Sequence, residues 1–192
     1  MRGLQEAMRR EKTIHETFWT SARPPGTEYC VVGKESGGWS LSGTVARLMR
    51  EGAMAATYDI RTDTGWRTKE AHIEQLSEGR YTRVTLDVRR GRWFVDGRER
   101  FDLEGCVDID LGASPVTNTL PIKRNRIRVG SKVDLTAAWV RFPTLEVTPL
   151  KQSYERVGAR RFIYKSTTGF KAELELDGHG LVKRYGDYWT AV

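Results

Sequence analysis

Hydrophobic and polar side chains alternate along most of this chain, in short runs separated by turn residues. Tyr81–Arg89 is a clear case, with Val84, Leu86 and Val88 at every second position and polar or charged side chains between them. Successive side chains of a β-strand point to opposite faces of the sheet, so this alternation predicts a strand with one face in the core. Phe170–Leu176 alternates in the same way and is predicted to be another strand.

Turn signals divide the chain at regular intervals. Asp63-Thr64-Gly65 favours a turn, and Asp96-Gly97 is typical of a hairpin. The pattern of Trp66–Leu76 fits a helix or a strand, and we predict a strand because turn-bounded strands surround it. The predicted strands are Thr17–Ser21, Glu28–Lys34, Trp39–Leu48, Met54–Arg61, Trp66–Leu76, Tyr81–Arg89, Trp93–Val95, Cys106–Leu111, Arg124–Val129, Lys132–Phe142, Thr144–Val147, Leu150–Val157, Arg161–Ser166, Phe170–Leu176 and Leu181–Tyr185.

The central stretch Leu103–Val129 combines two of these strands with a stiff connection. Cys106–Leu111 places Asp108 and Asp110 on one face, and Arg124–Val129 places three arginines, Arg124, Arg126 and Arg128, on one face. The connection Gly112–Pro121 contains two prolines, which fix φ and withhold backbone donors, and polar side chains that can bond to local backbone. An aspartate face and an arginine face joined in this way mark the candidate polar site.

Short alternating strands at regular turn spacing predict the fold class. We expect an all-β, mainly antiparallel protein rather than βαβ units: a single strongly curved sheet, or an open or closed β-barrel, with few short helices. With 192 residues and 39% hydrophobic residues, the chain can bury one sizeable core. We expect a flexible leader over residues 1–13 and a single β domain over residues 14–192.

Charge and cysteine content narrow the functional classes. The net charge of +7 comes from 32 basic and 25 acidic residues, a mixture typical of a solvated surface. A nucleic-acid-binding surface needs basic residues clustered on one element. Only Lys123–Arg128 approaches such a cluster, so we expect no nucleic-acid partner. Cys30 and Cys106 have neither CxxC spacing nor histidines nearby, so we expect no disulfide framework, no metal site and no cofactor.

The lengths of the hydrophobic runs help to predict the cellular compartment of the protein. The leader is too charged for the hydrophobic core of a signal peptide, and no run approaches the roughly 20 residues that a spanning helix needs. We therefore expect a cytoplasmic protein with reduced thiols and no transmembrane segment.

The two aspartates allow two interpretations. On one strand face, residues two apart lie about 6.6–7 Å from each other, near the separation of the carboxylates in inverting glycosidases. Asp108 and Asp110 could then serve as general acid and base. Alternatively they form a charge ladder with the arginine row, since opposite charges on neighbouring strands commonly pair. The arginines could also recognise a phosphate or carboxylate group, or only discourage edge pairing.

Several segments resemble one known family. Gly105–Leu111 followed by Ser114–Ile122 resembles the signature of the putative glycolipid-binding family of bacterial proteins. The whole resemblance extends from roughly Trp19 to Trp189. Further matching segments are Trp93-Phe94-Val95-Asp96-Gly97, Gln152-Ser153-Tyr154 and the ending Asp177, Gly180-Leu181-Val182, Tyr185 and Trp189. The resemblance implies a β-fold similar to lipoprotein carriers. Gly186 and Thr190 depart from the family ending, where a proline and a basic residue are usual.

The resemblance and the polar site together favour non-catalytic binding of an amphipathic ligand, such as a glycolipid, in a β-sheet cavity. The alternatives are a cytoplasmic enzyme acting on a sugar or phosphorylated metabolite through Asp108 and Asp110, and a structural or interaction domain without a ligand. The histidines are isolated in the sequence and no serine-nucleophile motif is present, so no other catalytic site is predicted. The sequence does not determine the oligomeric state. The candidate ligand-binding residues are Trp93, Asp108, Asp110, Asn118, Thr119, Arg124, Arg126, Arg128, Tyr154, Tyr185 and Trp189.

Overall fold

The computed structural model describes residues 12–50 and 52–192, and most of them lie in strands of one sheet. The strand order is β8-β7-β6-β5-β4-β3-β2-β1-β15-β14-β13-β12-β11-β10-β9. The strands are β1 (Lys12–Ala22), β2 (Pro25–Glu35), β3 (Gly38–Met49), β4 (Gly52–Thr62), β5 (Thr68–Ser77), β6 (Arg80–Arg89), β7 (Arg92–Val95), β8 (Arg98–Glu99), β9 (Asp108–Leu111), β10 (Lys132–Val140), β11 (Val147–Arg156), β12 (Arg161–Ser166), β13 (Lys171–Leu176), β14 (Val182–Tyr185) and β15 (Trp189–Ala191).

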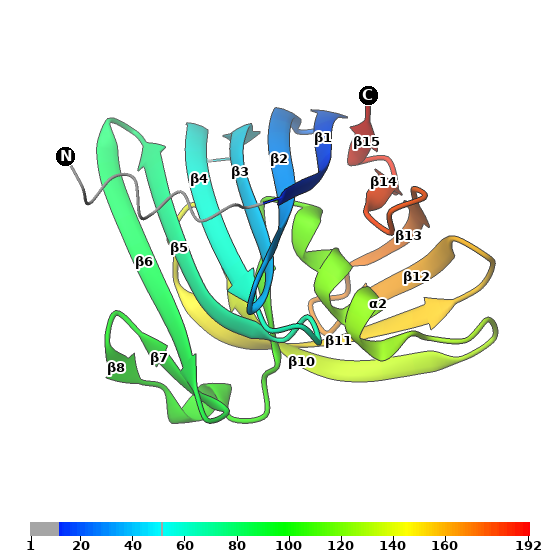
Figure 1. Ribbon diagram of the computed structural model, residues 1–192. Helices are drawn as coiled ribbons and strands as arrows, with labels where there is room; N and C mark the ends of the chain where they lie inside the picture. The colour runs from blue at the N-terminus through cyan, green and yellow to red at the C-terminus, as the bar shows by residue number, and fades with distance from the viewer. Residues whose placement is uncertain (1–11, 51) are drawn as a thin grey trace.

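The sheet is curved and does not close into a barrel. The first and last strands of the chain meet in its middle, where Trp19 pairs with Ala191 and Thr20 pairs with Thr190. From there the strands run outward to β8 on one side and β9 on the other, and these two edges do not pair with each other. A sheet of this width coils because each strand is twisted relative to its neighbour. Figure 1 shows the sheet wrapping around helix α2 (Thr119–Asn125).

The predicted fold class is confirmed: the protein is all-β and mainly antiparallel, with one short α-helix among the described residues. The ambiguous segment Trp66–Leu76 is largely strand β5. The predicted strand Thr144–Val147 is wrong except at Val147, because the chain turns at Phe142–Thr144 before β11. Strand β15 was not predicted, since its three residues are too few to show alternation.

The predicted strand Arg124–Val129 is also wrong. The chain forms a 3₁₀ turn, η2 (Val116–Asn118), and then α2, which ends at Asn125. Val116 and Leu120 are four residues apart, so they share one helical face, and both are fully buried. Pro121 lies in the first turn of α2, where a backbone N–H has no partner within the helix, so proline is tolerated there.

One pair of neighbouring strands is parallel. β9 and β10 run in the same direction, with Asp108 beside Ala137 and Leu111 beside Val140. Parallel neighbours cannot be joined by a tight turn, because the chain must return to the end at which it started. The η2–α2 segment makes this return across the concave face of the sheet (Figure 1). This edge pair with its helical crossover is compatible with the predicted sheet, which is mainly and not wholly antiparallel.

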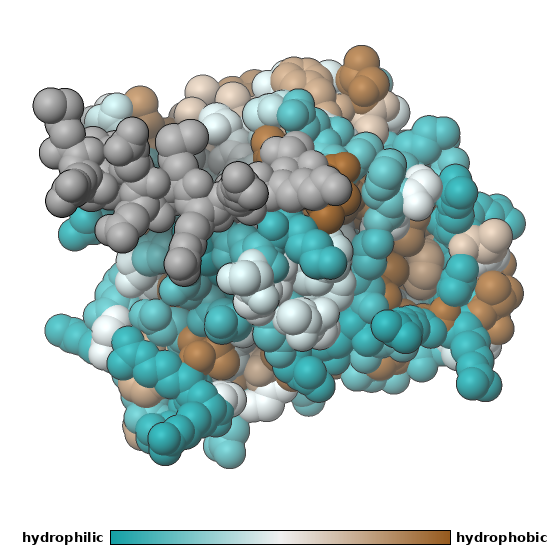
Figure 2. Space-filling view, viewed as in Figure 1, coloured by the Kyte–Doolittle hydropathy of each residue, from teal (hydrophilic) through white to brown (hydrophobic). Residues whose placement is uncertain are grey.

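The hydrophobic core lies between the concave face and the η2–α2 segment. Its largest fully buried side chains include Trp19, Trp93 and Trp189. The indole nitrogens of Trp19 and Trp93 donate to the carbonyls of Val182 (2.7 Å) and Cys106 (2.9 Å), so these buried polar atoms are satisfied. Hydrophilic side chains cover most of the described surface on the face seen in Figure 2.

The expected leader, residues 1–13, lies outside the described residues except for Lys12 and Thr13, which begin β1. Among residues 12–50 and 52–192, no helix has both the length and the hydrophobicity needed to cross a bilayer. The sheet is continuous from β8 to β9.

Candidate functional site

A hollow of about 260 Å³, here called the aromatic pocket, lies on the concave face beside η2. Six aromatic side chains line it together with a few polar ones. The polar lining comes mainly from Arg47 of β3, Asp110 of β9 and Ser114 and Asn118 of the crossover. The aromatic lining consists of Trp139, Tyr164, Phe170, Tyr185, Tyr188 and Trp189.

Strand pairing brings the aromatic rings together. Tyr164 of β12 lies opposite Ala172 of β13, whose small side chain leaves room for neighbouring rings. The Tyr164 ring is 6.1 Å from the ring of Tyr185, and Phe170 is 5.2 Å from Tyr188. These distances and tilted angles are typical of aromatic clusters. The rings therefore form a preformed wall built by adjacent strands.

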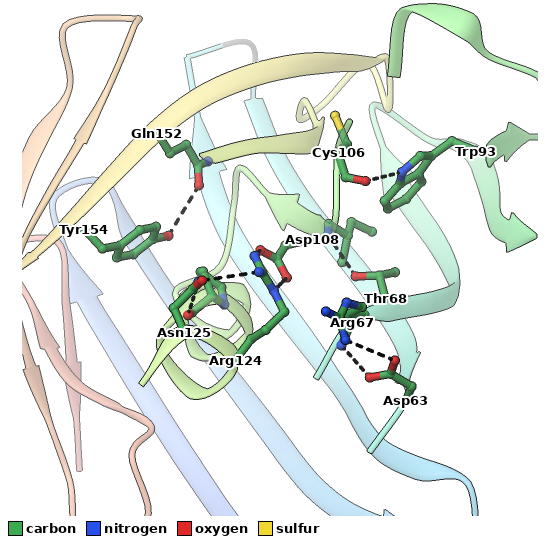
Figure 3. Close-up of polar contacts among 12 residues, drawn as sticks. Asp63, Arg67, Thr68, Trp93, Cys106, Asp108, Arg124, Asn125, Gln152 and Tyr154 are labelled. Carbon is green, nitrogen blue, oxygen red and sulfur yellow. Dashed lines mark hydrogen bonds and ion pairs between the residues drawn. The ribbon is translucent and has the colours of Figure 1, made fainter. Parts of the chain in front are cut away.

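Asp110 lies at the polar end of the aromatic pocket. Its carboxylate accepts hydrogen bonds from the hydroxyl of Thr117 (3.1 Å) and the amide of Gln152. Burial raises the pKa of Asp110 to about 6, although these two hydrogen bonds act in the opposite direction. The network continues through Tyr154, whose hydroxyl donates to Asn118 Oδ1 (2.9 Å) and lies near Gln152 (Figure 3).

A second carboxylate, Glu28, lies beneath the pocket lining. Glu28 Oε1 accepts from the hydroxyls of Tyr58 (2.5 Å) and Ser114 (2.6 Å). Tyr58 reaches it across β3 because Gly43 has no side chain: a Cβ there would lie 2.3 Å from the Tyr58 oxygen. Burial raises the pKa of Glu28 to about 7, while the hydrogen bonds from Ser114 and Tyr58 and then the nearby charge of Arg47 oppose the shift. Arg47 also stacks over Trp189, 4.8 Å from its ring centroid.

Asp108 has a different environment from Asp110. It is 1% exposed and forms a two-pronged ion pair with Arg124, whose side chain is 15% exposed (Figure 3). The two contacts are 3.2 Å from Nε to Oδ1 and 2.5 Å from Nη2 to Oδ2. Burial raises the pKa of Asp108 in spite of this partner. The two aspartates share a strand, but Asp108 pairs with Arg124 while Asp110 lines the aromatic pocket.

The three arginines do not form one row. Arg124 is paired with Asp108 from within α2, and Arg128 is exposed on the following loop. Arg126 caps α2 and lines a second hollow, of about 650 Å³, at the C-terminal end of the helix. We call this second hollow the basic groove, because its lining includes Lys123, Arg124, Arg126, Arg156 and Arg160.

Some of the other predicted residues line the aromatic pocket, and the rest are buried in the protein. Tyr185 and Trp189 line the aromatic pocket, as do Asp110 and Asn118. Tyr154 is buried and bonds to Asn118. Trp93 and Thr119 line neither of the two hollows, and both are buried.

Several residues that line the aromatic pocket were not predicted from the sequence. Tyr164 lies at an inward position of β12, and Phe170 lies directly before β13. Both belong to alternating segments, and such a pattern indicates burial but not a shared pocket. Trp139 lines the pocket from β10, where it pairs with Asp110. Arg47 gave no signal, because a single arginine in an alternating strand is normally solvated.

The described residues offer no evident metal site. No three His, Cys, Asp or Glu side chains of residues 12–50 and 52–192 gather in a way that could hold a metal ion. Cys30 and Cys106 are both buried free thiols. Burial raises the pKa of Cys106 to about 11, which disfavours the reactive thiolate.

Comparisons with known proteins agree with this fold. A search of the curated proteins found no match to the chain. The crystal structure of a DUF1089 family protein from Pseudomonas aeruginosa superposes with a TM-score of 0.77 at 29% identity, covering 86% of this chain and 92% of that one. The family model described as "Putative glycolipid-binding" matches residues 16–191. Because this match spans nearly the whole chain, the protein belongs to the putative glycolipid-binding family.

Proposed function

We propose that the protein binds the sugar head group of an amphipathic ligand, such as a glycolipid, in the aromatic pocket, without catalysing a reaction. The observation that carries this proposal is the lining itself: six aromatic rings face a hollow into which Asp110, Asn118 and Arg47 also project polar groups. A sugar ring has hydrophobic faces and a rim of hydroxyls. Rings on the walls and a few polar groups that fix orientation suit such a molecule.

The size of the pocket limits which part of the ligand it takes. Its volume of about 260 Å³ lies just below the roughly 300–1,000 Å³ usual for sites that enclose a drug-sized ligand. A head group of one or two rings therefore fits better than a whole glycolipid. The hydrophobic portion would extend from the mouth, where Tyr188 is 38% exposed.

The environment of the aspartates favours binding over acid–base catalysis. An acid–base pair needs two carboxyl groups that reach the substrate. Asp108 is almost fully buried and held by Arg124, so only Asp110 of the two lines the pocket. Asp110 still has acceptor capacity beyond its bonds to Thr117 and Gln152, so it can accept from a sugar hydroxyl.

Asp110→Asn is expected to weaken the binding of octyl β-glucoside about tenfold or more. The substitution keeps the shape but removes the charge, and hydrogen bonds to a charged group are worth about 1.5–3 kcal/mol. Isothermal titration calorimetry below the critical micelle concentration measures this affinity. Asp134→Asn is the matched control, since Asp134 is 72% exposed on β10 and lines neither hollow.

Three results would argue against the proposal. They are absence of octyl β-glucoside binding by the unmodified protein, equal losses of affinity in Asp110→Asn and Asp134→Asn, and equally tight binding of an octyl chain that carries no sugar. Methyl β-glucoside, which has the sugar but no chain, is expected to bind more weakly than octyl β-glucoside at the same site.

The affinity for octyl β-glucoside is expected to depend on pH through Asp110. Its pKa is raised to about 6, so the acceptor carboxylate is present above that value and becomes protonated below it. Binding should therefore weaken as the pH falls through about 6. Asp110→Asn should lack this fall in affinity near pH 6. A profile that is the same in both proteins would assign the pH dependence to another group.

A further inference from the structure

The basic groove is separate from the aromatic pocket and differs from it in chemistry. It lies at the C-terminal end of α2, and its floor is hydrophobic, with Ile127, Phe162 and Leu176 all buried. Figure 2 shows hydrophobic side chains recessed between hydrophilic ones over β12 and β13. A hollow with a hydrophobic floor and a charged rim can take a ligand that combines a charged group with a ring or chain.

The rim carries positive charge that the described residues neutralise only in part, through the ion pair of Arg124 with Asp108. Among the residues that the structure describes, Asp177 is the only carboxylate of the lining, and it is bound by His15 (3.0 Å) and by the backbone amides of His179 and Leu181. Within residues 12–50 and 52–192, the side chains of Arg126 and Arg160 form no hydrogen bond or ion pair. An uncompensated cluster of guanidinium groups in a hollow attracts anions.

Lys123 is held in place with no carboxylate of the described part of the chain in contact. Its ammonium donates to the carbonyl of His179 and lies 5.7 Å from the ring centroid of Trp66. Lys123 lies close to Gly180, whose φ is +80°: a Cβ there would lie 2.8 Å from Lys123 Nζ. Burial lowers the pKa of Lys123, as expected for an ammonium without a contacting anion. Its position is fixed before any ligand binds.

The backbone at Arg126 is in a conformation that favours glycine. Arg126 follows the last helical residue with φ 46° and ψ 46°, the left-handed region. Glycine is the usual residue at such a helix end, and other side chains are strained there. Arg126 lines the groove from this position at a cost in local strain. Such strain is often retained where the side chain has a function.

Trp66 provides a rigid wall beside these cations. Asp63 Oδ1 accepts from the amides of Gly65 (2.8 Å) and Arg67 (2.9 Å) and so fixes the loop. The loop places Trp66 against Trp39, with ring centroids 4.5 Å apart. The groove is therefore shaped on one side by ordered aromatic rings and on the other by α2 and its cap.

We propose that the basic groove binds a phosphate monoester, with the phosphate at Lys123, Arg126 and Arg160 and the attached ring or chain on the hydrophobic floor. Arginine matches the oxygens of phosphate in a two-pronged geometry, and lysine acts as a point charge. Several cations without a carboxylate partner suit a dianion better than a single carboxylate. This proposal goes beyond sugar binding in the aromatic pocket and does not depend on it.

The test uses the full chain and isothermal titration calorimetry at fixed ionic strength. Decyl phosphate, below its critical micelle concentration, represents a lipid head group, and glucose 6-phosphate represents a soluble metabolite. Binding of either ester more tightly than inorganic phosphate supports the proposal, and the tighter of the two identifies the source. Arg126→Gln and Arg160→Gln are each expected to lower that affinity about tenfold.

Arg128→Gln is the matched control, because Arg128 is exposed on the same loop and does not line the groove. Asp110→Asn should leave the binding of decyl phosphate, which carries no sugar, unchanged, and this separates the site from the aromatic pocket. Arg126→Gly relieves the backbone strain, so it should lose affinity without a fall in Tm, and a folding defect is thereby excluded. Equal losses in Arg126→Gln and Arg128→Gln, or no preference for esters over inorganic phosphate, would overturn the proposal.

Discussion

Asp108→Leu is expected to lower the free energy of unfolding by about 3–5 kcal/mol. The substitution leaves the Arg124 guanidinium, only 15% exposed, without the carboxylate that balances its charge. Removing one partner of a buried ion pair usually has an effect of this size, because the remaining charge stays desolvated. Urea denaturation at neutral pH, followed by far-UV circular dichroism, measures the change.

The double variant Asp108→Leu/Arg124→Met is expected to recover most of that loss. Burial raises the pKa of Asp108 even though Arg124 is only 2.5 Å away, so desolvation of the carboxylate outweighs the attraction between the two groups. Replacing both charges with hydrophobic side chains of similar volume is therefore close to neutral. The coupling between the two substitutions should be large and of opposite sign to the single effects.

The exposed pair Lys132–Asp134, at 2.9 Å, provides a control for this cycle. Its side chains are 52% and 72% exposed, so solvent screens the interaction and the same double-mutant cycle should give little coupling. If Asp108→Leu leaves the stability unchanged, the ion pair is not a structural element. Asp108 would then again be a candidate for a role in ligand binding.

The sequence was sufficient for most of the strands but not for the crossover. Alternation identified strands such as β6, because one face of each contacts the core and the other contacts solvent. The segment Gly112–Val129 was interpreted as a polar connection and a strand, yet residues 113–122 are all buried. The helical spacing of Val116 and Leu120 was present, but two prolines and three alternating arginines masked it.

The candidate site depends on contacts that local patterns do not encode. Asp108 and Asp110 were expected to share one environment, because residues two apart on a strand share a face. In the folded chain, α2 presents Arg124 to one of them, while Gln152 of β11 contacts the other. The aromatic pocket joins side chains from β3 to β15, so only the strand order of the sheet brings them together.

Glu28→Gln is expected to remove a pH dependence of stability worth about 3 kcal/mol. The pKa of Glu28 is raised from its ordinary value of 4.5 to about 7, because the side chain is 1% exposed. Between these two pH values the folded protein binds the proton more tightly than the unfolded chain does. The stabilisation is therefore complete below about pH 4.5 and is lost as the pH rises through about 7. Glutamine stays neutral and can still accept from Tyr58 and Ser114.

Urea midpoints of the two proteins at several values between pH 4.5 and 8 should diverge in favour of Glu28→Gln as the pH rises. Glu74→Gln, an exposed position on β5, should keep the slope of the unmodified protein. Parallel curves for Glu28→Gln and the unmodified protein would mean that Glu28 remains ionised throughout, held by the charge of Arg47. Divergence of the two sets of urea midpoints would also have a consequence for sugar binding. Ser114 and Arg47 both line the aromatic pocket, so ionisation of Glu28 near pH 7 changes the charge directly beneath the proposed sugar site.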